Sequence, residues 1–399
     1  MTVVFKSFAF SLALAVLSGP LSSLVFIGDY SDMTQQVRQD TDLARAETLY
    51  QTILASFYVP EFNLYREHNQ VLPEDNAFSF LWPYSGMISA VNALAAAPGG
   101  ERYHADLVRV LDGLEQYWDG RADPPGYDSY VREFGGGQKY YDDNEWLGLD
   151  FVDAYRTLGD PVYLEKAKAT FTFAISGWSD ELGGGIYWRE NDPTTKNTCS
   201  NGPAAVLAMK LYQETGEQQY LDWAVRILEW LKPLKAPSGV YWDSISDKRT
   251  IDFRTFTYNT GTIIHANALL YQETGEQKYL DEARALAEAS VAHFMREDPQ
   301  SGQAFYPDTP WFNAVLLRGY VALYYADPQH DPKYIETMRA NLDHAWTHAR
   351  GEEGFVNPDW AGDASVQRGT DGKEGVYWLL DQAALVEMYA TLAQLPFAS

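Results

Sequence analysis

Cysteine is almost absent from this chain of 399 residues, which holds a single one, Cys199. One thiol cannot form an intrachain disulfide, and it cannot build a zinc site that needs several thiolates. Neither Cys nor His lies near Cys199 in the sequence, so we expect it to be a small, partly buried residue. We predict no metal and no cofactor.

Basic residues are also scarce, with 30 Lys and Arg against 55 Asp and Glu and a formal net charge of −25. Such a surface repels phosphate backbones and anionic membranes, which argues against nucleic-acid and lipid-surface partners. Aromatic residues are abundant instead, at 15% of the chain. Part of this excess belongs to the core, but Trp and Tyr also form the faces on which neutral sugars stack.

The N-terminal stretch "MTVVFKSFAFSLALAVLSGPLSSLVFIGD" has one early Lys, an apolar run and then small residues. It resembles a secretory signal, although it lacks a clean cleavage site, and Ser18, Gly19 and Pro20 interrupt the apolar run. We therefore divide the chain into a signal peptide or hydrophobic segment at 1–28 and one domain at 29–399. The expected location is secreted, periplasmic or cell-surface, with no stable membrane insertion after signal removal, and we expect a monomer.

Internal repeats indicate the architecture. The segments "LYQETGEQQYLDWA" and "LYQETGEQKYLDEA" are nearly identical, and looser copies occur elsewhere. Each copy carries a Tyr just after a turn, at positions 103, 163, 220, 279 and 334, so the repeat is about 58 residues long. This period fits an αα-hairpin in which the Tyr packs against the preceding helix. Five such turns and a closing helix predict an all-α fold, an (α/α)6 barrel of six αα-hairpins in a single domain.

Helices before each short turn, such as "NGPAAVLAMKLY", are apolar or small nearly all round, whereas those after it are amphipathic. The first kind is typical of a buried inner helix and the second of an outer one. The long loops therefore lead to the N-termini of the inner helices at one barrel end. All but the third carry aromatics and most add Asn or Asp, in "FSFLWPYSG", "KYYDDNEW", "KNTCSNGP", "FRTFTYNTG", "TPWFNAV" and "KEGVYWLLDQ". We predict a binding cleft there, with helix capping as the alternative for some of these polar residues.

Two neighbouring carboxylates, Asp142 and Asp143, fall at the start of the second inner helix. Cleavage of a glycosidic bond needs one protonated and one ionised carboxyl group, and two coupled carboxyls in an aromatic cleft separate their pKa values. Adjacent side chains can reach the separation of about 5–5.5 Å that a retaining mechanism uses more readily than the roughly 6.5–9.5 Å of an inverting one. With Glu145 they lack the ligand spacing of a dedicated calcium loop.

The segments "YYDDNEWLGLDFVDAYRTLGDPVYLEKA", "SGWSDELGGGIYWRE" and "FTYNTGTIIHANALLYQETG" resemble glycoside hydrolase family 76, the α-1,6-mannanases. The resemblance implies an (α/α)6 barrel that cleaves α-1,6-mannosidic bonds of mannan with retention, and we expect endo-action. It implies Asp142 as nucleophile and Asp143 as general acid/base. We expect the sugar to be bound by Trp82, Tyr141, Asn144, Trp188, Asn197, Asn201, Asp252, Tyr258 and Asn259.

Other functions are also compatible with these sequence features. Another (α/α)6 enzyme, an unsaturated glucuronyl hydrolase or a sugar epimerase, shares the architecture, as does a mannan transglycosylase or a glycan-binding protein. An epimerase needs mouth histidines, which the six leading segments lack, and a uronate enzyme needs cations such as Arg254 or Lys196. His265 departs from the family pattern but lies two turns into its helix, so we expect a satisfied core histidine.

Overall fold

The computed structural model of the protein describes residues 27–298, 302–360 and 375–396. In those ranges the chain forms twelve α-helices and four small antiparallel sheets. The predicted N-terminal segment 1–28 lies outside the described residues except for its last two, which begin helix α1. Within the same ranges, no helix is both long and apolar enough to cross a bilayer.

Six helices form a closed inner ring. They are α2 (Leu81–Ala96), α4 (Tyr141–Leu158), α6 (Gly202–Thr215), α8 (Thr257–Thr274), α10 (Pro310–Ala326) and α12 (Leu379–Ala393). Each packs against the next, and α12 returns to pack against α2, so the ring closes. The predicted inner ring of an (α/α)6 barrel is thereby confirmed.

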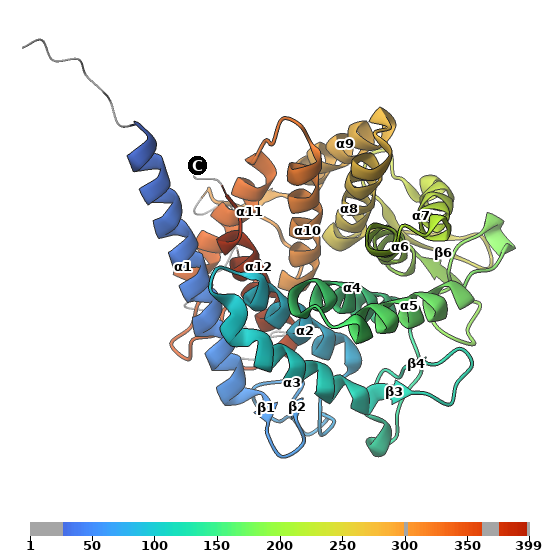
Figure 1. Ribbon diagram of the computed structural model, residues 1–399, viewed down its shortest axis with the longest axis horizontal. Helices are drawn as coiled ribbons and strands as arrows, with labels where there is room; N and C mark the ends of the chain where they lie inside the picture. Colours follow the sequence, from blue (N-terminus) through green and yellow to red (C-terminus); the bar gives the residue numbers. More distant parts are fainter. Residues whose placement is uncertain (1–26, 299–301, 361–374, 397–399) are drawn as a thin grey trace, which may run out of the picture.

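The other six helices surround this ring. They are α1 (Ile27–Ser56), α3 (His104–Leu114), α5 (Pro161–Ser176), α7 (Gln218–Leu231), α9 (Gln277–Phe294) and α11 (Lys333–His344). Five pairs are consecutive hairpins, as the repeats predict, but the sixth joins the two ends of the chain because α12 packs against α1 (Figure 1). A buried ion pair between Asp42 of α1 and Arg339 of α11 fixes α1 to the neighbouring outer helix.

The polarity pattern agrees with the two rings. In α12 all but one residue is buried, whereas α7 buries Tyr220, Ala224, Ile227, Leu228 and Leu231, which recur at the three- and four-residue spacing of one helix face. The inner helices are enclosed by protein on every side, so an apolar surface all round costs them nothing. The outer helices bury one stripe and leave the other in water.

The repeated tyrosines pack as expected at two of the turns. Tyr163 stacks on Phe151 of α4, and Tyr334 stacks on Tyr320 of α10, with ring centroids 6.5 and 5.3 Å apart. The other contacts differ, since Tyr220 meets Phe171 of the neighbouring outer helix α5. The repeat therefore joins hairpins to one another as well as closing each turn.

Glycines allow α8 and α10 to pack backbone against backbone. A Cβ built on Gly319 lies 2.4 Å from the carbonyl oxygen of Gly261, and one built on Gly261 lies 2.6 Å from the Cα of Leu316. Both obstacles are backbone atoms, which cannot rotate out of the way as a side chain can.

We expect Gly319→Ala to lower the free energy of unfolding by about 1–3 kcal/mol, because the added methyl group forces the two inner helices apart. Urea denaturation measures the change. Tyr325→Ala, an exposed position on the same helix, serves as the control and should stay within about 0.5 kcal/mol of the parent. Equal stability of Gly319→Ala and the parent would show that α8 and α10 are not packed this closely.

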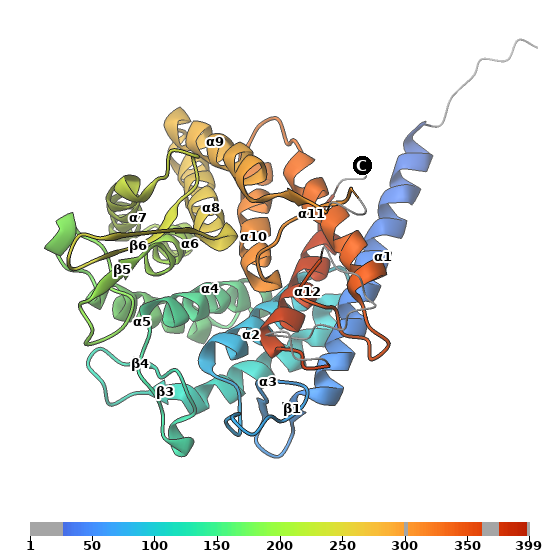
Figure 2. The ribbon, with the colours of Figure 1, turned by 180° about the vertical axis from the view of Figure 1, so that it is seen from behind.

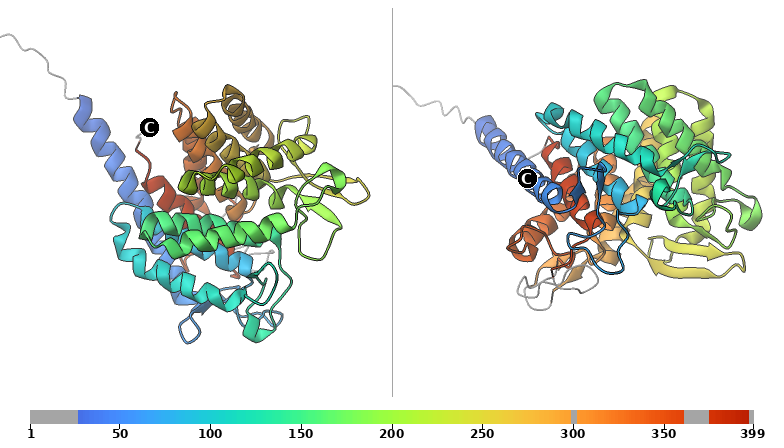
Figure 3. Two further views of the ribbon diagram at one scale, coloured as in Figure 1. Left: turned by 45° about the vertical axis from the view of Figure 1, so that its right-hand side comes forward. Right: turned by 90° about the horizontal axis from the view of Figure 1, so that it is seen from below.

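The strands lie in the long loops that lead to the inner helices. Three hairpins pair β1 (Tyr58–Val59) with β2 (Leu64–Tyr65), β3 (Trp118–Asp119) with β4 (Gly126–Tyr127), and β8 (Arg296–Glu297) with β9 (Ala304–Phe305). A three-stranded sheet runs in the order β5 (Thr195–Asn197), β6 (Trp242–Ser246), β7 (Ile251–Thr255), on the side of α6 and α7 (Figure 2). Its β6–β7 hairpin projects beyond the helices (Figure 3).

Candidate active site

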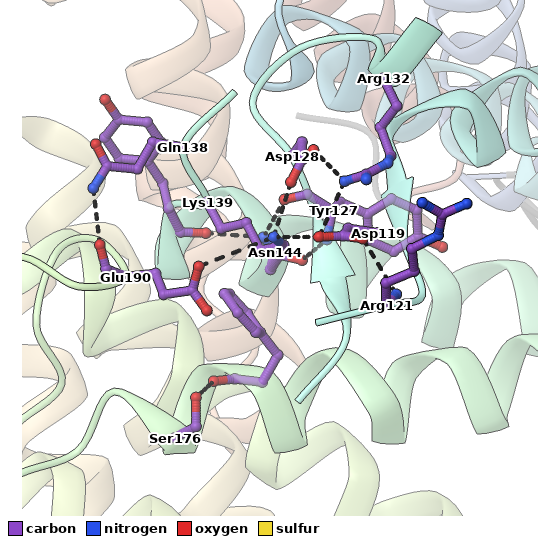
Figure 4. A network of polar contacts seen from close by, with 12 residues as sticks. Asp119, Arg121, Tyr127, Asp128, Arg132, Gln138, Lys139, Asn144, Ser176 and Glu190 are labelled. Atoms are coloured by element: carbon purple, nitrogen blue, oxygen red, sulfur yellow. Dashed lines mark hydrogen bonds and ion pairs between the residues drawn. The ribbon is translucent and has the colours of Figure 1, made fainter. Parts of the chain in front are cut away.

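The segment that leads to α4 is held by a network of ion pairs (Figure 4). The buried ammonium group of Lys139 lies 3.0 Å from a carboxylate oxygen of Asp119 and 2.9 Å from one of Asp128. Arg132 contacts the same two carboxylates, at 3.0 and 2.6 Å. Since Lys139 precedes the helix by two residues, this network fixes where α4 starts.

Asn144 in the first turn of α4 is a structural clamp. Its Oδ1 accepts from the backbone N–H of Tyr127 at 2.8 Å, and its Nδ2 donates to the carbonyl oxygens of Tyr127 at 3.1 Å and Tyr140 at 2.9 Å. The side chain is fully buried and its hydrogen-bonding groups are occupied. The structure thus places this predicted sugar-binding residue against strand β4 rather than in a cleft.

The same clamp recurs on two other inner helices. Asn201 accepts from the N–H of Ile186 at 2.8 Å and donates to its carbonyl at 3.0 Å, while Gln382 makes the same two bonds with Val356. Each amide ties the start of an inner helix to the loop before it. Asn201, also predicted to bind sugar, is therefore occupied by backbone contacts and lies outside the cavity.

Two more predicted residues face away from the cavity. The ring of Tyr141 packs on Phe173 of α5, with centroids 5.0 Å apart, and fills the space beside Gly177. Asn259 is fully buried, and its Nδ2 lies 3.4 Å from Oδ1 of Asp243. Asn259 thus supports Asp243, which does line the cavity, instead of reaching it directly.

A cavity of about 650 Å³ opens at the end of the barrel where the inner helices begin. Seven of the eleven predicted site residues line it, namely Trp82, Asp142, Asp143, Trp188, Asn197, Asp252 and Tyr258. The cavity is also lined by residues that were not predicted as site residues, among them Glu67, Phe80, Asp243, Trp311, Phe312 and Trp378. Trp311, Phe312 and Trp378 belong to leading segments already marked as aromatic, whereas Glu67 carries no local signal because it precedes its helix by a long loop.

Aromatic rings from several inner helices form one wall. Trp82 meets Trp311 and Trp378 edge to face, both at 5.3 Å between centroids. Tyr258 and Phe312 stack with centroids 4.1 Å apart. Large flat rings suit the apolar faces of a neutral sugar, and the polar and charged residues that also line the cavity can bond with its hydroxyl groups and fix its orientation.

Asp142 and Asp143 have different electrostatic surroundings. Burial raises the pKa of Asp142 to about 6, while the Cys199 thiol and the Trp188 indole N–H, 3.3 Å from Oδ2, oppose that rise. Burial and the charge of Asp142 together raise the pKa of Asp143 well above its usual range. Near neutral pH this environment favours an ionised Asp142 beside a protonated Asp143.

Cys199 and Glu145 complete the surroundings of the pair. Cys199 is buried more deeply than the partly buried position expected for it, and it lines the cavity. Glu145, one turn along α4 from Asp142, is fully buried outside the cavity, and burial raises its pKa well above the usual range. Among the described residues, no group of three or more His, Cys, Asp or Glu side chains is placed to hold a metal ion.

The cations considered for a uronate enzyme are already engaged. The guanidinium of Arg254 lines the cavity but donates to both carboxylate oxygens of Asp252, at 3.1 Å to Oδ1 and 2.7 Å to Oδ2. The ammonium of Lys196 is buried and donates to the carbonyl oxygens of Ser179, Glu181 and Gly184. An epimerase would need histidines in this cavity, and none is among the described residues that line it.

A barrel of paired helices with a carboxylate pair in an aromatic mouth defines a class of carbohydrate-active protein. The profile of glycosyl hydrolase family 76 matches residues 42–396. The chain belongs to this family.

Solved structures of the family superpose over most of the chain. A family 76 glycoside hydrolase (mannosidase) from Bacteroides thetaiotaomicron VPI-5482 is 30% identical, with a TM-score of 0.79 over 88% of this chain and 98% of that one. The α-1,6-mannanase GH76A of Salegentibacter sp. HEL1_6 is 27% identical, with a TM-score of 0.73 over 88% and 99%. That structure is of an inactive variant in which two consecutive aspartates are replaced by asparagine, in complex with α-1,6-mannotriose.

Curated relatives match over a shorter stretch. A mannan endo-1,6-alpha-mannosidase of Saccharomyces cerevisiae is 31% identical over 147 residues, which cover 34% of this chain. This chain matches about a third of that relative's own length, 33%.

Proposed function

We propose that this protein is a glycoside hydrolase that cleaves α-1,6-mannosidic bonds of mannan, acting within the chain and with retention of configuration. The observation that carries the proposal is the carboxyl pair at the N-terminus of α4, inside an aromatic cavity. The α-1,6-mannanase with both consecutive aspartates replaced, which is inactive and binds α-1,6-mannotriose, supports it.

Asp142 is the proposed nucleophile and Asp143 the proposed general acid/base. The indole N–H of Trp188 donates to Asp142 and stabilises its ionised form, whereas the environment of Asp143 holds the proton. In the first step Asp142 attacks the anomeric carbon, and Asp143 protonates the departing oxygen. In the second step Asp143 takes a proton from water, which displaces Asp142 from the sugar.

An endo mode of action is supported by the exposure of the cavity's rim. The aromatic side chains of Phe80 and Trp188 line the cavity and are still 44% and 36% exposed. A sugar chain can therefore extend past the reacting residues into water. A closed pocket around a terminal sugar would bury these rings.

The pH dependence of kcat/KM follows from the two pKa values. Activity needs Asp142 ionised and Asp143 protonated, so it should fall as the pH drops through about 6 and Asp142 takes up a proton. The basic limb lies at higher pH because the pKa of Asp143 is raised well above its usual range. The apparent pKa values of the two limbs belong to the coupled pair and not to either carboxyl group alone.

Trp188→Phe removes one donor to the ionised form of Asp142 and should raise its pKa, so the acid limb moves to higher pH. Initial rates on α-1,6-mannotetraose between pH 4 and 9 measure this. Trp223→Phe, which changes a Trp outside the cavity, is the matched control. An acid limb that stays in place, or moves to lower pH, would remove Trp188 from this role.

Linkage specificity tests the substrate class. We expect linear α-1,6-mannan to be cut into manno-oligosaccharides, while α-1,2- and α-1,3-linked mannobioses stay intact. Products resolved by length separate the modes of action, since mannose alone as the early product would contradict endo-action. Products longer than an α-1,6-mannotetraose substrate would identify transglycosylation as the main reaction. Folded protein that cuts none of these substrates would contradict the proposal.

Secretion is part of the proposal and rests on the signal-like composition of residues 1–28, with residues 29–399 as the catalytic domain. Expression of the full chain in a bacterial host with an export pathway tests it. The mass of the exported protein should correspond to loss of the N-terminal segment. An uncleaved chain that stays in the cytoplasm would contradict this part without affecting the enzymatic proposal.

A further inference from the structure

A second cavity, of about 270 Å³, lies at the opposite end of the barrel from the mouth. All six inner helices contribute polar side chains to it from their middle or C-terminal turns. These are Ser89 and Asn92 from α2, Asp150, Asp153 and Arg156 from α4, Lys210 from α6, His265 from α8, Arg318 from α10 and Glu387 from α12. A hydrophobic inner ring would fill this space with apolar side chains, so its polar lining requires a reason.

Most of the charges around this cavity are neutralised by one another. The ammonium of Lys210 donates to both oxygens of Asp153, at 2.6 and 2.8 Å. The guanidinium of Arg318 donates to both oxygens of Glu387, at 2.5 and 2.7 Å. Arg156 donates to Glu214 at 2.6 Å. With each cation already engaged by a carboxylate, the cavity offers no free positive charge for an anion.

Two buried side chains keep a polar atom without a partner, and burial raises the pKa of one of them, Asp150, to about 8, so its carboxyl holds a proton at neutral pH. Asp150 accepts from the hydroxyl of Ser89 on Oδ1 at 2.8 Å, but its Oδ2 has no hydrogen-bond partner in the described part of the chain. Asn92 donates to the backbone carbonyl of Asp150, while its Oδ1 is likewise unpartnered there. The two residues are 3% and 5% exposed. Buried polar atoms of this kind destabilise the fold unless a hydrogen-bond partner reaches them.

His265 faces the same cavity. We expected a satisfied core histidine, but this side chain is half-buried, and no hydrogen bond joins its ring to the described residues. Burial first, and then the charge of Lys210, lower the pKa of His265 to about 3, so the imidazole is neutral. A neutral imidazole offers one N–H donor and one nitrogen acceptor, which is the pair of functions that a hydroxyl group satisfies.

We propose that this cavity binds one small, neutral, polyhydroxylated molecule, a single sugar ring or cyclic polyol, whose hydroxyls bond with Asp150, Asn92 and His265. The unpartnered atoms call for hydroxyl groups, which donate as well as accept, rather than for a charge. Lys210 and Arg318 disfavour a cation, and the carboxylates of Asp153 and Glu387 disfavour an anion. The volume of about 270 Å³ is well above the space that one water molecule needs, so the cavity has room for a larger molecule.

A route into the cavity exists. The side chains of Asp153 and Arg156 lie at its rim and are 40% and 39% exposed. A ligand can therefore enter from this end without passing the catalytic mouth. The proposed site is independent of the proposed mannanase activity, because none of its residues lines the mouth cavity.

The ring resonances of His265 report on this cavity in the unmodified full-length protein, after assignment with His265→Gln. We expect myo-inositol and D-mannose to shift the His265 resonance with saturation in the millimolar range. Potassium chloride, ammonium chloride and sodium phosphate should leave it unchanged. A saturable shift with one of these salts would replace the polyol by an ion, and no shift with either polyol would leave water as the occupant; both outcomes overturn the proposal.

Variants connect the shift to the named residues. In Asn92→Leu two methyl groups replace the amide oxygen and nitrogen at nearly the same volume, so the hydrogen bond to the polyol is lost and the polyol-induced shift should vanish. Ser89→Ala is the milder change if Asn92→Leu does not fold, and we expect it to weaken polyol binding at least threefold, because Asp150 loses a donor and its carboxyl reorients. Trp188→Ala, at the mouth, should keep the shift in full. Both far-end variants should retain mannan hydrolysis, so the failure of this site and the failure of the enzymatic proposal are separable. An undiminished shift in a folded Asn92→Leu protein would place the ligand elsewhere.

Discussion

Replacing Asp142 with Ala is expected to lower kcat on α-1,6-mannan on the order of 10⁵-fold, the scale at which loss of a covalent nucleophile acts. Asp143→Ala should lower it by about 10²–10⁴-fold, because a general acid assists departure of the leaving group without forming the bond to the sugar. Both side chains are half-buried at the start of α4, so neither change should unfold the barrel. Far-UV circular dichroism before each assay checks this.

The two roles are separable with a better leaving group. A dinitrophenyl glycoside of α-1,6-mannobiose departs without protonation, so Asp143→Ala should regain much of its rate on this substrate and Asp142→Ala should not. Azide should then give a glycosyl azide with Asp143→Ala, because the second step no longer has its base. If Asp142→Ala regained its rate on this substrate instead, Asp142 would be the general acid/base and Asp143 the nucleophile.

The matched control is Asp112→Asn, an exposed aspartate on the outer helix α3, which should retain full activity. If either Asp142→Ala or Asp143→Ala kept a rate within tenfold of the parent, that residue would lose its proposed role. Loss of activity together with loss of helix content would say nothing of chemistry, and the isosteric Asn variants then replace the Ala variants.

Asn144→Ala is expected to destabilise the fold by about 3 kcal/mol or more, the second large effect. The change leaves the N–H and carbonyl of Tyr127 without the Asn144 side chain, and the carbonyl of Tyr140 keeps only the 3.4 Å bond from the backbone N–H of residue 144. An unsatisfied buried group costs about 1–3 kcal/mol. Because the clamp sets the first turn of α4, kcat on mannan should fall as well. Urea denaturation and initial rates measure the two effects.

Asn201→Ala breaks the same clamp on the next inner helix and provides the comparison. We expect a similar loss in the free energy of unfolding, since the N–H and carbonyl of Ile186 and the carbonyl of Asn197 each lose a bond to the Asn201 side chain. The change should reduce kcat less, because the carboxyl pair is on α4. A large loss of affinity for mannotriose in Asn144→Ala, without loss of stability, would instead support the direct sugar contact that the sequence suggested.

The barrel was predictable because its determinants are local and repeated. The Tyr-marked turns and the contrast between "NGPAAVLAMKLY" and amphipathic partners define hairpins, and six hairpins close a ring. The pairing of α12 with α1 was not predictable in this way, because α1 belongs to no repeat and meets α12 only in three dimensions.

The helix N-termini that carry the site residues were predictable, but the direction in which each side chain points was not. Neighbours on a helix point about 100° apart, so Asp142 and Asp143 face the cavity while Tyr141 packs outward on Phe173 and Asn144 turns back to Tyr127. An Asn near a helix N-terminus looks the same in the sequence whether it binds a sugar or backbone. Three clamps with one geometry, made by Asn144, Asn201 and Gln382, distinguish the two only in the structure.

Proton NMR of α-1,6-mannotetraose during digestion tests the central proposal most directly, because it reports cleavage and stereochemistry together. The proposal predicts that the first new reducing end is the α-anomer, with the β-anomer appearing later by mutarotation. First formation of the β-anomer would contradict a covalent role for Asp142. An unchanged spectrum with folded protein would contradict the assignment of α-1,6-mannan as the substrate.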